Sequence, residues 1–147
     1  MLYPLSILTS EKNVFNEDVY SVNVPGADGY FEVLAHHATV IALLQPGKLT
    51  IINKDHQKLY FGITTGFIEV SHNSATIIAD AIESVQEIDV ERAKQSYERA
   101  KMRLESPDKH VDKERAKRSL NRAKNRIKLF LEIHPQVSFI PLKALLI

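Results

Sequence analysis

Short apolar runs separated by turn residues fill the chain over residues 2–88. Turn signals such as Pro25-Gly26 and Pro46-Gly47 lie between the runs. Apolar and polar residues alternate clearly over Tyr60–Val70, which indicates strands with one face in water. The predicted strands are Tyr3–Leu8, Val19–Val24, Tyr30–Leu34, Thr39–Leu44, Lys48–Ile52, Lys58–Ile63, Phe67–Ser71 and Ala75–Ile82, with Asn13–Phe15 as a further short one. Many short strands at close spacing predict an antiparallel β-sandwich or flattened barrel.

Beyond this part the pattern changes to a seven-residue repeat. Glu91-Arg92-Ala93-Lys94 returns as Glu98-Arg99-Ala100-Lys101, and Glu114-Arg115-Ala116-Lys117 returns as Asn121-Arg122-Ala123-Lys124. Such a repeat keeps one stripe of a helix facing one partner. The stripes are Val90, Ala93, Tyr97, Ala100 and Leu104 in the first half and Ala116, Leu120, Ala123, Ile127 and Phe130 in the second.

Helix start and stop signals divide this repeat region into two helices. Asp89 and Asp112 fit helix N-caps. Pro107 forces the residue before it out of helical geometry, so the chain can reverse there. We therefore expect an α+β protein in which an N-terminal antiparallel β-sandwich or flattened barrel (1–87) precedes a C-terminal antiparallel two-helix hairpin (88–132). An apolar tail (133–147) follows, and its Pro135 and Pro141 interrupt regular structure.

The stripe that joins the two helices is thin, because four of its ten residues are alanine. Each buried methylene contributes about 0.8 kcal/mol, whereas ordering one residue costs about 1–2 kcal/mol of backbone entropy. The hairpin should therefore be marginally stable alone and depend on docking, on a ligand or on both.

Charged residues are unevenly distributed along the chain and around the helices. Residues 89–132 hold fourteen Lys/Arg and eight Asp/Glu, whereas the remainder holds five and ten. One flank of the stripes carries Arg92, Ser96, Arg99, Arg103, Arg115, Ser119, Arg122 and Arg126, and the other carries Lys94, Lys101, Lys117 and Lys124. Like flanks face each other in an antiparallel pair, so six arginines share one edge.

Two interpretations of this edge remain open. Most runs of charge form a solvated helix face. Arginines this close together nevertheless repel one another unless an anion neutralises them, and their planar fork suits phosphate. The edge is therefore a candidate site for a polyphosphate or an acidic protein surface. A nucleic-acid-binding module would also explain the charge, but Tyr97, the single aromatic residue before Phe130, lies in the stripe rather than where it could stack on bases.

Several other classes of function have little support. Without cysteine the chain has neither a disulfide nor a thiolate metal site. The adjacent pair His36-His37 points apart in an extended chain, which is poor geometry for a metal. Catalytic motifs are missing, and no sequence pattern pairs Glu69, Asp80 and Glu83 as a catalytic acid and base. The default interpretation of each is a solvated or turn-capping carboxylate, so we expect no enzyme. We also expect no signal peptide and no membrane span.

This organisation resembles the epsilon subunit of bacterial F-type ATP synthase up to about Glu132. In the strand-rich part the resemblance rests on Gly26–Gly29, His37, Pro46-Gly47, Gly66-Phe67-Ile68-Glu69-Val70 and Ile78-Ala79-Asp80. In the helical part Ile88-Asp89-Val90-Glu91-Arg92-Ala93 fits the family's Ile/Leu-Asp-x-x-Arg-Ala nucleotide motif. Arg99, Arg122-Ala123 and Asn125-Arg126 stand where nucleotide-binding members carry arginine. The chain departs from the family at His36-His37-Ala38-Thr39, where Gly-His-x-Pro is usual, and at Glu32, where glycine is common.

The resemblance implies a non-catalytic rotor subunit that is peripheral to the cytoplasmic face of the bacterial plasma membrane. The sandwich would contact the gamma subunit and the c-ring, with Gly29, Glu32 and His37 as contact residues. The hairpin would lie folded on the sandwich, or open along gamma to meet the alpha and beta subunits and block ATP hydrolysis. An assembly adaptor with an inert hairpin is the alternative that lacks this switch.

ATP is the implied regulatory ligand, and it would favour the folded hairpin. The implied ATP-binding residues are Glu83, Ile88, Asp89, Arg92, Ala93, Arg99, Arg122 and Arg126. The arginines would hold the phosphates, the two carboxylates would accept hydrogen bonds from the base or ribose, and Ile88 and Ala93 would line the pocket. For Glu83 and Asp89 the alternatives are a strand-end carboxylate and a helix cap.

Overall fold

The computed structural model describes residues 1–134 and divides the chain into two compact units. The first is Met1–Gln86, and the second begins at Glu87. Most of the predicted apolar tail, residues 135–147, lies outside the described residues.

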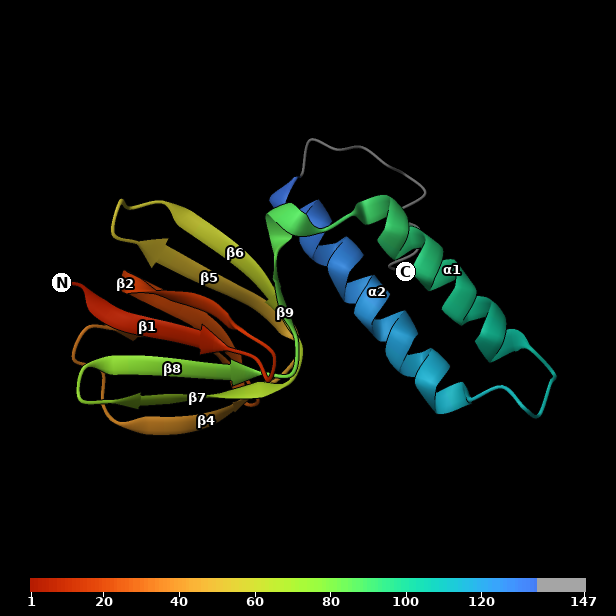
Figure 1. Ribbon diagram of the computed structural model, residues 1–147, viewed down its shortest axis with the longest axis horizontal. Coiled ribbons are helices and arrows are strands. Elements are labelled where there is room, and N and C mark those ends of the chain that lie inside the picture. Colours follow the sequence, from red (N-terminus) through yellow and green to blue (C-terminus); the bar gives the residue numbers. More distant parts are fainter. Residues whose placement is uncertain (135–147) are drawn as a thin grey trace. The chain divides into compact units, whose positions relative to one another are not determined.

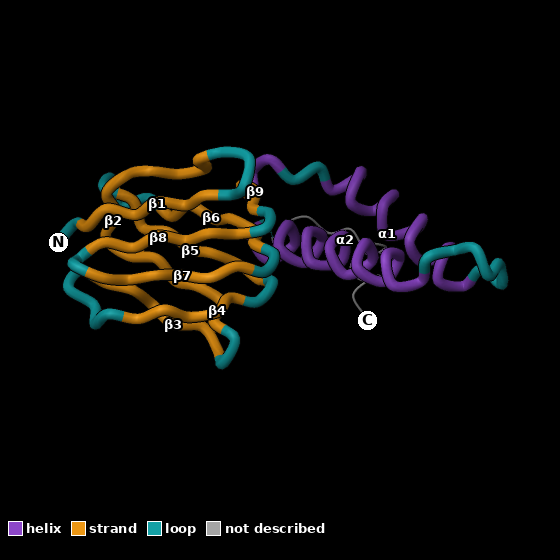
Figure 2. The backbone as a smooth tube through the Cα atoms, turned by 60° about the horizontal axis from the view of Figure 1, so that its bottom comes forward, coloured by secondary structure: helices purple, strands orange, loops and turns teal. Residues whose placement is uncertain are grey.

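The first unit is a nine-stranded flattened barrel, which confirms the predicted fold class (Figure 1). Its strands are β1 (Tyr3–Leu8), β2 (Asn13–Gly26), β3 (Gly29–Leu34), β4 (Val40–Leu44), β5 (Gly47–Asn53), β6 (Lys58–Ile63), β7 (Gly66–Ser71), β8 (Ser74–Ala79) and β9 (Ile82–Ser84). β1, β8, β7 and β4 lie side by side in one layer, and β2, β5 and β6 lie in the other (Figures 1 and 2). β1 pairs with both β8 and β2, so it joins the layers. The β1–β8 pair is parallel, whereas the other pairs recorded among the described strands are antiparallel.

Two predicted strand boundaries are wrong. The segments Asn13–Phe15 and Val19–Val24 belong to one long strand, β2, which pairs first with β1 and then with β3 and β5. The predicted strand Ala75–Ile82 is instead interrupted at Asp80, because the chain leaves β7 there and β9 pairs with β6.

Hydrogen bonds with Thr64 and Thr65 hold the chain at the point where it passes from β8 to β9. The Thr65 hydroxyl donates to an Asp80 carboxylate oxygen over 2.5 Å, and the Asp80 amide donates to the Thr65 carbonyl over 3.0 Å. The Ala81 amide donates to the Thr64 hydroxyl over 3.0 Å. Asp80 therefore has a structural partner at a turn, as its default interpretation predicts.

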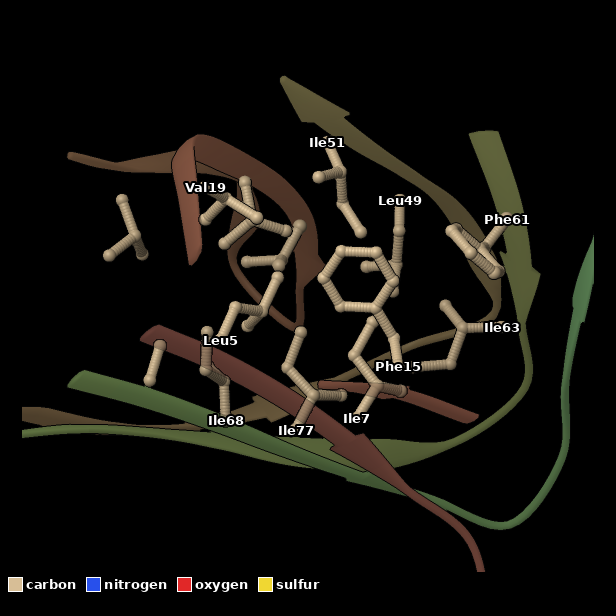
Figure 3. Packing of buried hydrophobic residues seen from close by; sticks show 14 of the residues in the cluster. Leu5, Ile7, Phe15, Val19, Leu49, Ile51, Phe61, Ile63, Ile68 and Ile77 are labelled. Atoms are coloured by element: carbon tan, nitrogen blue, oxygen red, sulfur yellow. The ribbon is translucent and has the colours of Figure 1, made fainter. Parts of the chain in front are cut away.

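Aliphatic and aromatic side chains from both layers fill the interior of the barrel (Figure 3). Phe15 and Phe61 pack edge to face, with ring centroids 6.2 Å apart. The buried Tyr3 hydroxyl donates to the Val33 carbonyl over 2.6 Å, and burial raises the pKa of this phenol above its ordinary value. Gly66 allows β7 to approach β8, because a Cβ there would lie 2.3 Å from the Ile78 carbonyl oxygen.

The second unit contains the predicted helical hairpin. A short 3-10 turn, η1 (Val85–Glu87), precedes α1 (Val90–Glu105), and α2 (Lys113–Ile133) returns antiparallel beside α1 (Figures 1 and 2). The Asp89 carboxylate accepts the Arg92 amide over 3.1 Å, and the Asp112 carboxylate accepts the Arg115 amide over 3.0 Å. Both predicted N-caps are thus confirmed.

The Lys113 side chain fastens the turn between the helices. Its ammonium group donates to the carbonyls of Arg103 (2.8 Å), Leu104 (3.0 Å) and Ser106. A cation is favourable there, because the last carbonyls of a helix lack intrahelical partners and carry partial negative charge.

The stripe between the helices has a buried alanine centre. Its four alanines, Ala93, Ala100, Ala116 and Ala123, are at most 2% exposed. Ile127 is fully buried and forms a cluster with Ala93, against which Val90, Tyr97 and Leu131 pack. The last turns of α2 differ from the prediction, since Leu129 is buried while Phe130 is half-buried. That segment is apolar on more than one face, so a single stripe does not describe it.

Two neighbouring isoleucines of β8 provide a matched test of the barrel core. Ile77 is fully buried and Ile78 is 39% exposed. We expect Ile77→Ala to lower the free energy of unfolding by about 2–5 kcal/mol, because it removes buried methylenes and leaves a cavity. Ile78→Ala should cost less than about 1 kcal/mol. Guanidinium denaturation followed by tyrosine fluorescence measures both, and equal losses would contradict the assignment of the two faces.

Candidate functional site

The candidate site begins at the first turn of α1. Ile88 is 7% exposed and Ala93 is fully buried, whereas the Arg92 side chain is exposed. The Asp89 carboxylate is the helix cap, and its recorded bond to the Arg92 amide engages one oxygen. The turn therefore places an exposed guanidinium beside two buried apolar residues.

Packing between the helices brings Arg92 to the level of Arg126. Ala93 and Ile127 belong to one buried cluster, so the first turns of α1 pack against the last turns of α2. Arg92 directly precedes Ala93 and Arg126 directly precedes Ile127. The two arginines therefore flank the same interhelical contact. Arg126 is half-buried and has a partner of its own.

Arg99 and Arg122 make equivalent contacts in the middle of the hairpin. Arg99 donates to the Ser96 hydroxyl over 3.2 Å, and Arg122 donates to the Ser119 hydroxyl over 3.1 Å. Each bond joins residues three apart on one helix, which are neighbours on its surface. These hydroxyl partners orient the guanidiniums without neutralising their charge.

A hollow of about 340 Å³ lies where the helices meet at the turn. It is lined by Arg103, His110, Val111, Asp112, Arg115 and Ala116. Arg103 from α1 and Arg115 from α2 thus border one space, as expected when the arginine flanks of an antiparallel pair face each other. We call these two levels, Arg92–Arg126 and Arg103–Arg115, together with Arg99 and Arg122 in the middle of the hairpin, the arginine ladder.

The arginine ladder concentrates positive charge that the protein leaves largely uncompensated. Within residues 1–134 the structure records no ion pair for Arg92, Arg99, Arg103, Arg115 or Arg122. Guanidinium groups donate in a planar fork that matches the oxygens of phosphate and carboxylate. The ladder can therefore bind an extended anion that offers several oxygen atoms.

The other predicted site residues lie in the first unit. Glu83 is half-buried in the middle of β9, where it pairs with Gly62, and not at the end of a strand. Gly29 begins β3 with a φ of 130°, a conformation suited to glycine. Glu32 is exposed on β3, and the half-buried His37 follows β3 with a ring nitrogen 2.7 Å from the Ala38 carbonyl.

Sequence reasoning missed a second, longer repeat in the helices. Asp89–Lys101 and Asp112–Lys124 are identical at nine of thirteen positions, with an offset of 23 residues. Val111-Asp112-Lys113-Glu114-Arg115-Ala116 is thus a near copy of Ile88-Asp89-Val90-Glu91-Arg92-Ala93. Comparing the two helices at this offset, rather than each with itself at seven, would have found it.

Three further observations concern metal binding, membrane crossing and base stacking. In the part of the chain that the structure describes, no three His, Cys, Asp or Glu side chains are grouped as a metal site would require. The helices between residues 1 and 134 are also too short or too polar to cross a membrane. Tyr97 packs against the Ala93–Ile127 cluster, so its ring is not free to stack on bases.

Family models match both units of the chain. Residues 3–85 match the beta-sandwich domain of the ATP synthase delta/epsilon chain, and residues 86–130 match its long alpha-helix domain. The fold also resembles chains in the cryo-EM structures of the Euglena gracilis and Tetrahymena thermophila mitochondrial ATP synthases. Their TM-scores are 0.67 and 0.61 at 21% and 20% identity, over 92% and 86% of this chain and 81% and 95% of theirs.

Sequence relatives agree with these matches. The ATP synthase epsilon chain of Chloroflexus aggregans is 39% identical over 92 residues, which are 63% of this chain and 66% of that one. The epsilon chain of Desulforamulus reducens is 39% identical over 102 residues, which are 69% of this chain and 76% of its own length. The chain therefore belongs to the delta/epsilon family of ATP synthase, on its epsilon branch, and is a non-catalytic subunit of that enzyme.

Proposed function

We propose that this chain is a central-stalk rotor subunit whose helical hairpin regulates ATP hydrolysis in response to ATP. The first unit joins the gamma subunit to the c-ring, and the second unit is the regulatory arm. The complex holds the chain peripherally at the cytoplasmic face of the membrane. Family membership supports the assembly, and the arginine ladder supports the response to ATP.

The edge of the barrel at β3 supports the docking part of the proposal. β3 pairs with β2 and with no other strand among those described, so one of its edges keeps unpaired backbone groups. Such an edge is a ready surface for another chain. Gly29 and Glu32 lie on β3, and His37 lies just beyond it, so the residues proposed to contact gamma and the c-ring follow one edge.

The contact between Ala93 and Ile127 carries the regulatory part. It holds Arg92 and Arg126 at one level only while α1 and α2 are paired. The proposed ATP site places its phosphates against these two arginines and against Arg99 and Arg122. Separation of the helices dismantles the site, so ATP binds the paired state alone.

The free energy of pairing the two helices and the free energy gained from bound ATP are of comparable size. An alanine-rich contact buries few methylenes, each of which contributes about 0.8 kcal/mol. A ligand that binds one state only, at a hundred times its dissociation constant, stabilises that state by about 2.7 kcal/mol. ATP can therefore change the population of a hairpin whose paired and separated states differ by a few kcal/mol. The separated helices expose basic surfaces to acidic segments of alpha and beta and block hydrolysis.

Replacement of Arg126 tests the ATP site. Arg126→Ala should weaken ATP binding about 10- to 100-fold, because hydrogen bonds to charged groups contribute about 1.5–3 kcal/mol. Isothermal titration of the full chain measures the affinity. Arg118→Ala is the matched control, since it removes the same charge from an exposed position of α2 outside the arginine flank. Equal affinities for the two variants would exclude the arginine ladder from the ATP site.

Removal of the hairpin tests regulation. The chain cut after Ile88 keeps the compact first unit and should still enter the reconstituted ATP synthase. At low ATP the complex with the cut chain should hydrolyse ATP faster than the complex with the whole chain. The difference should shrink as ATP rises, because ATP stabilises the paired hairpin. If both complexes have the same rate at every ATP concentration, the hairpin is inert.

A further inference from the structure

The 23-residue repeat gives the hairpin an approximate two-fold symmetry that includes the whole arginine ladder. A shift of 23 residues forward takes Ile88 to Val111, Asp89 to Asp112, Arg92 to Arg115, Ala93 to Ala116 and Arg99 to Arg122, and the same shift backward takes Arg122 to Arg99 and Arg126 to Arg103. In an antiparallel pair this exchange of helices is a rotation about an axis through the middle of the hairpin. Each of the seven hairpin residues of the proposed ATP site therefore has a chemically similar counterpart. Five of the counterparts lie toward the turn, whereas Arg99 and Arg122 exchange with each other.

The two ends of the hairpin are alike in structure as well as in sequence. The N-cap bonds of Asp89 and Asp112 are 3.1 and 3.0 Å long. The serine–arginine bonds in the two helices are 3.2 and 3.1 Å long. Ala93 and Ala116 are both buried, at 0% and 2% exposure. The repeat therefore reproduces backbone capping, side-chain contacts and helix packing together.

The counterpart end already has a hollow of suitable chemistry. Arg103 and Arg115 border it from opposite helices, and His110 adds a third nitrogen-bearing side chain. Its one carboxylate, that of Asp112, accepts the Arg115 backbone amide. Arg103 and Arg115 make no ion pair recorded within residues 1–134. The hollow is thus cationic, and its volume of about 340 Å³ can admit the end of a phosphate chain.

We propose that this hollow is a second binding site, for a polyphosphate chain, formed by Arg103 and Arg115 and continued by Arg99 and Arg122. The proposal rests on the proposed ATP site at the first end of the hairpin, because phosphate binding is transferred from that end to its counterpart. The ligand is a linear tri- or pyrophosphate, either free or carried by a nucleotide.

Two departures from the repeat set the selectivity of the second site. The position equivalent to Glu83, a proposed partner of the base or ribose, is Ser106 in the turn. The position equivalent to Val90 is Lys113, whose ammonium group donates to three carbonyls of the turn. The second site keeps the phosphate-binding arginines and a counterpart of Asp89, which is Asp112, but lacks the second proposed nucleoside-binding carboxylate. It therefore binds tripolyphosphate and ATP with similar affinity.

The symmetry also couples the two sites. Arg99 and Arg122 belong to both sets, because the two-fold axis passes between them. A phosphate chain that occupies the middle of the ladder from one end denies it to a chain from the other end. Occupancy of one site therefore weakens the other, and tripolyphosphate lowers the apparent affinity for ATP.

Titration of the full chain with sodium tripolyphosphate and separately with ATP, followed by amide resonances in NMR spectra, tests the second site. In Arg126→Ala, which weakens the first site, tripolyphosphate should still shift the amides of residues 111–116. Its affinity there should lie within about threefold of that of ATP, because the contacts are to phosphates. In the wild-type background, Arg103→Ala should weaken the binding that shifts residues 111–116 by about tenfold or more, whereas Arg118→Ala should change it less than about twofold.

The outcomes separate this proposal from the proposed function. Shifts at residues 111–116 that depend on Arg103 but occur without any ATP binding at Arg92 and Arg126 would support the second site and overturn the ATP-responsive first site. ATP binding that depends on Arg126, with no tripolyphosphate effect at residues 111–116, would overturn the second site alone. Equal behaviour of Arg103→Ala and Arg118→Ala, in chains of equal helicity by circular dichroism, would also overturn it.

Discussion

The close approach of α1 and α2 along small side chains is the contact on which the candidate site depends. Alanines let the two backbones approach, and this brings arginines from opposite helices to shared levels. The same alanines bury little apolar surface, so they contribute little to holding the arginines together against their repulsion. One choice of residue thus creates the anion site and makes its assembly depend on the anion.

Local signals in the sequence were sufficient wherever the structure depends on neighbours along the chain. The caps Asp89 and Asp112, the reversal around Pro107 and the alanine stripe follow from residues within one or two turns. The continuity of β2 and the break at Asp80 depend instead on partners far away in the sequence. Thr65, fifteen residues before Asp80, decides where one strand stops and the next begins.

The sequence predicts which types of residue form the site, but not which residues lie opposite each other across the two helices. The seven-residue repeat places the arginines on one flank, yet it does not say which arginine of α1 meets which arginine of α2. That pairing follows from the contact of Ala93 with Ile127 and from the hollow that Arg103 and Arg115 share. Glu83 lies on β9 in the first unit, outside the helices, so the seven-residue repeat gives no prediction for it.

The ammonium group of Lys113 gives the hairpin an unequal freedom to open. Three bonds to carbonyls near the end of α1 tie the beginning of α2 to the turn. The opposite end is held by non-directional apolar contacts of Ala93 and Ile127 with Val90, Tyr97 and Leu131. The helices should therefore separate by a hinge motion about the turn at Lys113. Displacement grows with distance from a pivot, so Arg92 and Arg126 separate most while Arg103 and Arg115 remain close. An anion bound between Arg92 and Arg126 therefore opposes the largest displacement that opening of the hairpin produces.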